Sequence, residues 1–312
     1  MSYNDILNIF IIFCVIFVFF QTMTFLKNYC KSINKKTFSE NFAGVDDAKD
    51  LNVSNNKYVC IYAYYEKNEE YKNNFEYFLK NGGIINEIDY YIIINGKCSL
   101  DIPDRTNIKV LYRENKGYDF GAWQYVIKHH INKPYEYYIF INSSVKGPYS
   151  DKNWLDEFLN LFNSGKDVKL VGTTINIFDE GFEGFNLNNE TMKIIYDKES
   201  PYTHVQSMFF IIDKEAFDFL YKKGFFDDEE KLSNFGHINN VIIYKEIMMS
   251  QMIIKNGWNI NCILPKYRDL DYRNIKQNIN PSGCDPYWPE TYFGNTIQPE
   301  DVIFYKGYRL KT

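Results

Sequence analysis

Hydrophobic and polar positions divide the chain into three stretches. Between Ile6 and Leu26, about 20 residues carry no charge, which is long enough for a helix to cross a bilayer. Residues 27–56 are polar and show no periodicity, as is typical of a stalk. From residue 57 onward, short apolar runs alternate with amphipathic ones without a second linker or an internal repeat. The pattern predicts a transmembrane anchor over 1–26, a stalk over 27–56 and one domain over 57–312.

Within the domain, short runs rich in β-branched and aromatic residues predict strands, and longer amphipathic runs predict helices. The predicted strands are YVCIYAYY (58–65), YYIIING (90–96), NIKVLY (107–112), YYIFINSS (137–144), VKLVGTTI (168–175) and HVQSMFFIID (204–213). The predicted helices are NNFEYFLKNGG (73–83), one that opens after residue 117, NWLDEFLNLFNSG (153–165), KEAFDFLYKKG (214–224) and the long apolar NVIIYKEIMMSQMIIKNGWNI (240–260). Because helices separate most strands, we expect an α/β fold with a mostly parallel sheet covered on both faces.

The first apolar stretch is typical of a signal-anchor or of a cleaved signal peptide. Its length, the absence of a basic segment before it and the lack of an A-x-A-like cleavage site favour the anchor. Four lysines between positions 27 and 36 follow the stretch, which by the positive-inside tendency leaves the domain in the cytosol. Sequons at Asn52 and Asn189 permit a lumenal domain instead. We therefore expect a single-pass membrane protein and leave its orientation open.

Charge and cysteine usage exclude some classes of protein. The formal net charge is −5, and no Lys/Arg block occurs beyond the region after the first apolar stretch, so we expect no nucleic-acid partner. The six cysteines are widely spaced, without a CxxC pair or a companion His at zinc-finger intervals. The sequence therefore does not predict a structural zinc site.

Polar or turn-forming residues follow four of the predicted strands. They occur at residues 64–66, 95–96, 115–119 and 142–148. In an open α/β sheet, ligands bind outside the carboxyl ends of the strands, so these junctions are the candidate binding positions. Taken singly, each is explained as well by the need of a strand end for turn residues. The chain has neither G-x-G-x-x-G after the first strand nor a P-loop, which disfavours dinucleotide oxidoreductases and P-loop NTPases.

The third junction combines a tight turn with a helix start. Asn115, Lys116 and Gly117 form the turn, and Asp119 stands where the helix begins. The free N–H groups of a helix start suit a pyrophosphate or a sugar hydroxyl, but the Asp119 carboxylate would repel an anion unless a cation or a hydroxyl lay between. Taken alone, Asp119 is more simply an N-cap residue.

Several motifs together resemble a known family. NKGYDFGAW, YYIFINSSVKGPY, KLVGTTIN, HVQSMFFIID and YFGNTIQPEDVIFYK occur in this order. They resemble a family of predicted glycosyltransferases from fungi, algae, bacteria and large DNA viruses, which is similar to rhamnan-synthesis F type proteins and to GT-A nucleotide-sugar transferases. The resemblance covers most of residues 58–310. It implies a GT-A like, Rossmann-like fold and hexosyl transfer from a nucleotide sugar to a glycan or lipid-linked acceptor.

The resemblance also implies a donor site at the strand ends. It places Tyr64, Tyr65 and Glu66 near the nucleotide base, and the third junction, through Asn115, Gly117 and Asp119, near the ribose or sugar.

The fourth strand ends in Asn142, Ser143 and Ser144, where many GT-A enzymes carry an Asp-x-Asp that holds a divalent metal on the diphosphate. Amide and hydroxyl oxygens alone form a weak site for a hard cation such as Mn²⁺ or Mg²⁺. Metal dependence is therefore in doubt unless Asp119 or a C-terminal acid supplies charge. The C-terminal candidates are Asp285, Glu300 and Asp301, and the His-Pro of the family's C-terminal stretch is Gln298-Pro299 here.

Glu246 is the only carboxylate in the apolar helix at 240–260. The resemblance matches it to the acid that inverting GT-A enzymes place on this helix, where it takes the proton of the acceptor hydroxyl. Apolar surroundings would raise its pKa toward working pH. The plain alternative is that Lys245 and Glu246 are a charged pair near a helix start that interacts favourably with the helix dipole.

Two further residues are candidate contacts for the acceptor or a phosphate. His204 opens a predicted strand and is equally well a structural histidine, and Trp288 lies in a Pro/Gly-rich loop that would flank a sugar or pack on the domain. The leading hypothesis is thus a membrane-anchored transferase. A metal-free sugar- or nucleotide-binding module and an anchored scaffold without a ligand are the alternatives.

Overall fold

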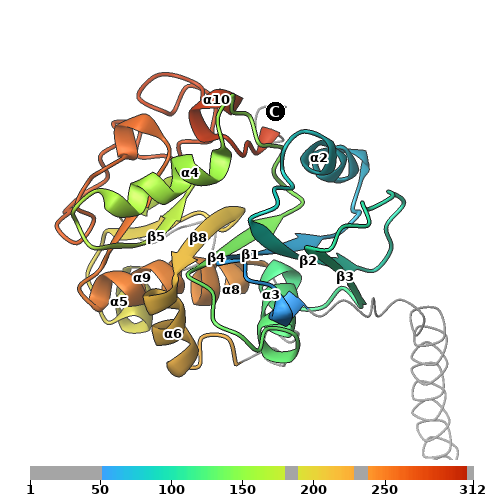
Figure 1. Cartoon of the computed structure of the whole chain (residues 1–312). Helices are drawn as coiled ribbons and strands as arrows, with labels where there is room; N and C mark the ends of the chain where they lie inside the picture. The colour runs from blue at the N-terminus through green and yellow to red at the C-terminus, as the bar shows by residue number, and fades with distance from the viewer. Residues whose placement is uncertain (1–50, 180–188, 228–237, 308–312) are drawn as a thin grey trace, which may run out of the picture. The chain divides into compact units, whose positions relative to one another are not determined.

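A seven-stranded sheet forms the centre of the fold, and its strands come from the runs rich in Ile, Val, Tyr and Phe, whose side chains favour strands. The computed structural model describes residues 51–179, 189–227 and 238–307 (Figure 1). The strand order is β3-β2-β1-β4-β8-β5-β9. These strands are β1 (Tyr58–Tyr64), β2 (Ile88–Asn95), β3 (Ile108–Arg113), β4 (Tyr137–Asn142), β5 (Val168–Gly172), β8 (Phe209–Asp213) and β9 (Asn259–Cys262).

Most neighbouring strands of this sheet run parallel, as predicted. β3, β2, β1 and β4 are parallel, and so are β5 and β9, whereas β8 is antiparallel to both β4 and β5. From β1 the chain adds β2 and β3 on one side and then returns to add β4 on the other. The direction of winding therefore reverses between β1 and β4, and the crevice outside their carboxyl ends is where open α/β sheets bind ligands.

Two of the predicted strands are each divided in two. The run at 168–175 ends as β5 and continues as β6 (Ile175–Phe178), and the run at 204–213 consists of β7 (Tyr202–Val205) and β8. β6 and β7 pair antiparallel as a separate two-stranded sheet. The breaks fall at polar residues: Thr174 Oγ1 donates to Gln206 Oε1 (2.6 Å), and Gln206 N donates to Thr174 O (3.2 Å).

Helices cover both faces of the large sheet, as predicted (Figure 1). On one face, the ring of Phe158 lies 4.4 Å from that of Phe209 in β8. On the other, the ring of Trp123 lies 5.3 Å from that of the next residue, Phe210. The main helices are α2 (Glu69–Lys80), α3 (Tyr118–His129), α4 (Trp154–Leu159), α5 (Asn189–Tyr196), α6 (Lys214–Lys222), α8 (Ile238–Val241), α9 (Met248–Lys255) and α10 (Pro299–Val302), and short 3₁₀ turns occur at Leu51–Val53, Asn160–Asn163 and Pro265–Tyr267.

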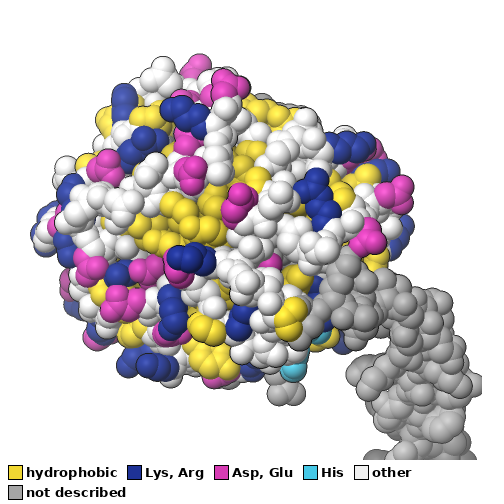
Figure 2. Space-filling view, in the orientation of Figure 1, with side chains coloured by type: hydrophobic (Ala, Val, Ile, Leu, Met, Phe, Trp, Pro, Cys, Tyr) yellow, Lys and Arg dark blue, Asp and Glu magenta, His cyan; other side chains and the backbone are white. Residues whose placement is uncertain are grey.

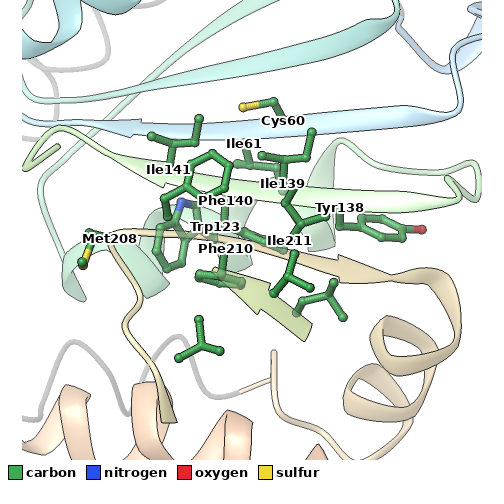
Figure 3. Close-up of a cluster of buried hydrophobic side chains, with 14 of the residues drawn as sticks. Cys60, Ile61, Trp123, Tyr138, Ile139, Phe140, Ile141, Met208, Phe210 and Ile211 are labelled. Atoms are coloured by element: carbon green, nitrogen blue, oxygen red, sulfur yellow. The ribbon is translucent and has the colours of Figure 1, made fainter. Parts of the chain in front are cut away.

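The core beneath β4 and β8 holds α3 in place. Trp123 of α3 packs against Phe140 (ring centroids 5.5 Å apart) and Phe210, and these two phenylalanines stack on each other at 4.7 Å (Figure 3). All three side chains are buried. Since Trp123 lies one helical turn after Asp119, this packing also fixes the position of the Asp119 carboxylate.

The predicted long helix at 240–260 is three segments and a strand. α8 passes into a π-helical stretch (Ile242–Ile247), α9 follows, and residues 259–262 form β9. A hydrophobic run does not distinguish the wider π turn from an α turn, and Gly257, with φ of 89°, ends the helix before the strand. Glu246 lies in the π-helical stretch, a geometry that often occurs at functional sites.

The last residues assigned to the stalk lie against the domain. Leu51 is buried, and the side chain of Asn52 donates to His130 O (3.0 Å) and accepts from Asn132 N (3.1 Å). Residues 51 and 52 of the predicted stalk thus contact the domain, because polar side chains can fasten a segment that lacks hydrophobic periodicity. The predicted anchor at 6–26 lies outside the described residues, and none of the helices between 51 and 307 that are described is long and apolar enough to span a bilayer.

Charged side chains of both signs are interspersed over the face shown in Figure 2. Among the described residues of that face, no continuous basic stretch is visible. That nucleic acid is not a partner stays a prediction from the sequence.

Candidate active site

The ends of β1 and β4 are joined directly at the point where the sheet reverses its winding. Ser143 N donates to Ala63 O (3.2 Å), and Tyr65 N donates to Ser143 Oγ (3.2 Å). Asn74 of α2 donates to Ser143 O (3.1 Å). The first and fourth predicted junctions therefore lie side by side at the carboxyl end of the sheet.

At this edge, Tyr64 and Tyr65 have different environments. Tyr64 is fully buried, and its hydroxyl donates to Glu66 Oε2 (3.0 Å), whereas Tyr65 is 40% exposed. Glu66 Oε2 also accepts from Ser99 N (2.7 Å), beyond β2. Burial raises the pKa of Glu66, but hydrogen bonds with Ser99 and Tyr64, together with the charge of Lys72, outweigh it, so the pKa lies below its usual range. Glu66 thus fastens the β1 end to the following loop, and Tyr65 offers the accessible ring.

The third junction is a turn that only glycine tolerates without strain at its centre. Gly117 has φ of 72° and precedes α3, and Tyr118 also has positive φ, at 56°. Arg113 Nη2 donates to Lys116 O (3.0 Å) and braces the turn. Asn115 is exposed on it. The helices α2, α4 and α6 begin with a side-chain cap, such as Asn68 for α2, whereas Gly117, the N-cap residue of α3, makes no side-chain cap hydrogen bond.

Asp119 is not the N-cap residue. Gly117 holds that position, and the Asp119 carboxylate lies in the first turn, where its Oδ2 accepts from Asn142 Nδ2 at 2.8 Å. Burial raises the pKa of Asp119 to about 6, and nearby Glu246 adds to the rise, while the charge of Lys306 and the hydrogen bond from Asn142 oppose it. The side chain therefore faces the strand ends, not its own helix.

A short set of hydrogen bonds connects Asp119 to Glu246. Asn142, which binds Asp119, donates its backbone N–H to Met208 O (3.1 Å) at the start of β8. The preceding residue, Ser207, donates to Glu246 Oε2 through its backbone N–H (2.6 Å) and through its hydroxyl. The break between β7 and β8 thus brings the two carboxylates to the same end of the sheet.

Glu246 lies in polar rather than apolar surroundings. Besides the two bonds from Ser207, its Oε1 lies 3.7 Å from Nε2 of His204. The side chain is 14% exposed. The expected apolar pocket is therefore wrong, because Ser207 and His204 come from a segment that is distant in sequence. Lys245 and Glu246 also do not act as a charged pair on the helix dipole, since Lys245 points away from Glu246 and donates from Nζ to Phe225 O.

His204 and Trp288 differ in exposure. His204 is 1% exposed, its Nδ1 lies 3.2 Å from Tyr202 O, and it faces Glu246, so it is placed to orient that carboxylate and not to meet an acceptor directly. Trp288 is 44% exposed. It follows Asp285, which accepts from Gln206 Nε2 (2.9 Å) next to Ser207. Its loop therefore lies beside the break between β7 and β8.

The residues at the end of β4 do not suit a divalent metal. Asn142 Oδ1 accepts from Ser144 N (2.9 Å) and Ser144 Oγ (2.6 Å), so its Nδ2, a donor, faces Asp119. Two of the C-terminal acids lie at the start of α10. Asp301 accepts from Gln298 N (2.8 Å), and Glu300 is exposed. Within the described ranges, no three His, Cys, Asp or Glu side chains gather as a metal site. Hard cations need several oxygen ligands, and the residues at the end of β4 together with the C-terminal acids do not provide them.

Sequence reasoning missed the contribution of the C-terminal segment. Lys146 and Tyr305 exchange two backbone hydrogen bonds of 2.8 Å, and Tyr149 N donates to Ile303 O (2.7 Å), so residues 303–305 pair with the loop after β4. The next residue is Lys306, whose charge acts on Asp119. Ser207 was missed as well. Both residues lie within motifs that carry the family resemblance, but no role was assigned to either, because both reach the site through pairing between distant segments.

The chain matches no protein-family model, and no curated protein matches it at a significant level. Solved structures similar to it include S. aureus TarS 1–349, at 14% identity over 56% of this chain and 51% of that one, with a TM-score of 0.33. Mouse xyloside xylosyltransferase 1 in its apo form is 9% identical over 80% of this chain and 97% of that one, with a TM-score of 0.40.

The chain spans about half the length of the TarS structure. Identities of 14% and 9% with TM-scores below 0.5 establish no shared activity, so inference about function depends on the geometry of this chain.

Proposed function

We propose that the protein is a glycosyltransferase that moves a sugar from a nucleotide-sugar donor to a glycan or lipid-linked acceptor. The observation that carries the proposal is the linked pair of carboxylates, Asp119 and Glu246, at the carboxyl end of the sheet beside the point where its winding reverses. This is the position where open α/β sheets bind ligands. The two acids have different surroundings, and such a difference is how acid and base roles are separated.

The donor would lie across the strand ends from β1 to β4. Tyr65 would offer its exposed ring to the nucleotide base, and the hydrogen bond from Tyr64 to Glu66 fastens the chain on either side of Tyr65. The turn at Asn115 and Gly117 and the uncapped start of α3 face the ribose and phosphates, and Asp119 accepts a hydrogen bond from a hydroxyl of the ribose or sugar. Asn142, Ser143 and Ser144 would hold this edge in place.

Glu246 would act as the general base of an inverting reaction. The acceptor hydroxyl oxygen attacks the anomeric carbon, the bond from that carbon to the diphosphate oxygen breaks, and its electron pair leaves with the diphosphate. The hydroxyl proton goes to Glu246, whose Oε2 is held by Ser207 and whose Oε1 faces His204. Trp288 would stack on the acceptor sugar from its exposed loop. Positioning by Ser207 and His204 keeps the carboxylate aimed at one point.

A hydrolysis assay on the full-length chain in mild detergent tests this proposal. Release of nucleoside phosphate from UDP-, GDP-, dTDP- and CMP-sugars measures transfer to water, which needs the same base. We expect turnover with one donor and a loss of roughly 10²–10⁴-fold in Glu246→Gln, with donor binding retained. Glu87→Gln is the matched control, because Glu87 is exposed just before β2, at the other end of the strand. Full activity in Glu246→Gln would reject Glu246 as the base.

One observation favours a second function, a sugar- or nucleotide-binding module without turnover. Asn142 donates from Nδ2 to Asp119, and the resemblance matches its segment to the Asp-x-Asp with which many GT-A enzymes present oxygens to a metal. Saturable binding of one nucleotide by the wild-type chain, with no turnover of any donor, would support this function and remove the transferase.

We further propose that residues 6–26 anchor the protein in a membrane as a single span, with the orientation open. An anchored domain would meet lipid-linked acceptors at the bilayer surface. Resistance of the full-length chain to extraction by alkaline carbonate is expected, and release of the intact chain into the soluble fraction would contradict it.

A further inference from the structure

The end of β4 presents a hydrogen-bond donor where a metal would need an acceptor. The backbone N–H of Ser144 can only donate, so its partner at 2.9 Å must be the carbonyl oxygen of the Asn142 side chain. The amide nitrogen of Asn142 is thereby turned toward Asp119. A diphosphate bound here carries at least two negative charges, and without a metal some other cation must balance them.

The C-terminal segment places a lysine next to this edge. Gly147, in the loop after β4, lies so close to the segment that a Cβ there would stand 2.5 Å from Ile303 O. Phe304 is buried and stacks on Phe209 with ring centroids 4.3 Å apart. Tyr305 pairs with Lys146 through two backbone hydrogen bonds. These contacts fix the backbone of residues 303–305, which directly precede Lys306.

The side chain of Lys306 is half-buried, and its charge opposes the rise in the pKa of Asp119, which is consistent with an ammonium group near the end of β4. An ammonium group has three N–H donors and is a common partner of phosphate. The charge of Lys306 acts on Asp119, and a bound phosphate would be the stronger partner for the ammonium group.

We propose that Lys306 supplies the positive charge that binds the diphosphate of the donor, so that the protein binds its nucleotide without a divalent cation. This inference rests on the proposed function, since it concerns the same crevice. Asp119 would then turn to a hydroxyl of the ribose or sugar, and the Asn142 amide would remain a fixed donor at the edge. The leaving diphosphate gains one negative charge as the sugar departs, and Lys306 stabilises that charge as well.

Calorimetric titration of the full-length chain in mild detergent tests the proposal. The ligands are the nucleoside, its monophosphate and its diphosphate, for each base in turn, with EDTA and with Mn²⁺. We expect the diphosphate to bind more tightly than the nucleoside, with a Kd that differs by less than about threefold between EDTA and Mn²⁺. We expect Lys306→Met to weaken diphosphate binding by about 10- to 100-fold, to leave nucleoside binding within about twofold, and Lys306→Arg to restore most of the loss.

Lys222→Met is the matched control, because Lys222 is exposed at the end of α6, and we expect it to change neither affinity. Diphosphate binding that requires Mn²⁺, or Lys306→Met that leaves the diphosphate affinity unchanged, would overturn the role of Lys306 and leave the transferase proposal standing. If no nucleoside or nucleotide binds, both proposals fail together. The comparison of EDTA with Mn²⁺ uses the wild-type chain, so it decides the question even if a Lys306 variant does not fold.

Discussion

At the scale of single residues, the site depends on Asp119 being a carboxylate in a place that disfavours its charge. Its partner Asn142 lies 23 positions away in sequence, and the other charges that act on it belong to Glu246 and Lys306. From the sequence, Asp119 was identifiable as a candidate by its place after a strand and a turn. Its pairing and its raised pKa were not, because they arise from residues that only the fold brings together.

The pKa of Asp119 predicts how stability changes with pH. Its value rises from 3.8 to about 6 in the folded chain, so the folded state holds its proton to higher pH than the unfolded state. Below about pH 4, Asp119 therefore does not change the free energy of unfolding. As pH rises from about 4 to about 6, its ionisation lowers the free energy of unfolding, and above about pH 6 this loss is complete, at most about 3 kcal/mol. Asp119→Asn removes the charge but can still accept from Asn142.

We expect Asp119→Asn to raise Tm at pH 8, by the equivalent of about 1–3 kcal/mol, and to leave it nearly unchanged at pH 4. Thermal unfolding of the full-length chain at both pH values is the measurement. Asp101→Asn, at an exposed position, is the control that should show no such difference. A variant that is less stable at pH 8 than at pH 4, relative to wild type, would show that the charge of Asp119 is stabilised in the fold.

At the scale of elements, α3 matters because of how it starts. Its N-cap is Gly117, and its second glycine, Gly121, lies over the turn, where a Cβ would stand 2.5 Å from Lys116 O. The helix can therefore sit close to the turn only with glycine at this position. That closeness sets where Asp119, between the two glycines, presents its carboxylate.

Gly121→Ala is expected to destabilise the fold. In an exposed helix interior, this change would normally stabilise by about 1 kcal/mol, because alanine is the better helix former. Here the Cβ meets a backbone carbonyl, which cannot move aside without shifting the turn. We expect a net loss of about 1–3 kcal/mol, measured by urea unfolding, together with weaker nucleotide binding. A gain in stability would mean that the turn and the helix are free to separate.

The elements show what hydrophobic patterning can and cannot predict. Six of the seven strands of the sheet, all except β9, and the main helices that cover it followed from apolar runs, because burial on both faces leaves a continuous hydrophobic signal. The break at Gln206 and Ser207 and the π-helical stretch around Glu246 did not follow, since both depend on which backbone groups pair. The functional arrangement lies at these two irregularities, where local pattern and fold disagree.

At the scale of the whole molecule, the C-terminal segment, residues 303–306, connects the core of the fold with the candidate site. It follows α10, pairs with the loop after β4 and packs Phe304 between Phe209 and Trp154, whose ring lies 5.3 Å from that of Phe304. The last described residues thus contact the face that α4 covers and the binding edge together. Stability and ligand binding are therefore expected to depend on the same contact.

Phe304→Ala tests this coupling against Phe217→Ala. Both rings are buried. Phe304 stacks on Phe209. On the other face, Phe217 of α6 stacks on Tyr138, with ring centroids 3.6 Å apart. Each variant should lose about 3–5 kcal/mol of the free energy of unfolding, measured by urea denaturation. Only Phe304→Ala should also weaken nucleoside diphosphate binding at a temperature where both remain folded, because only it releases Lys306. Equal affinities in the two variants would mean that the segment stabilises the fold without positioning the lysine.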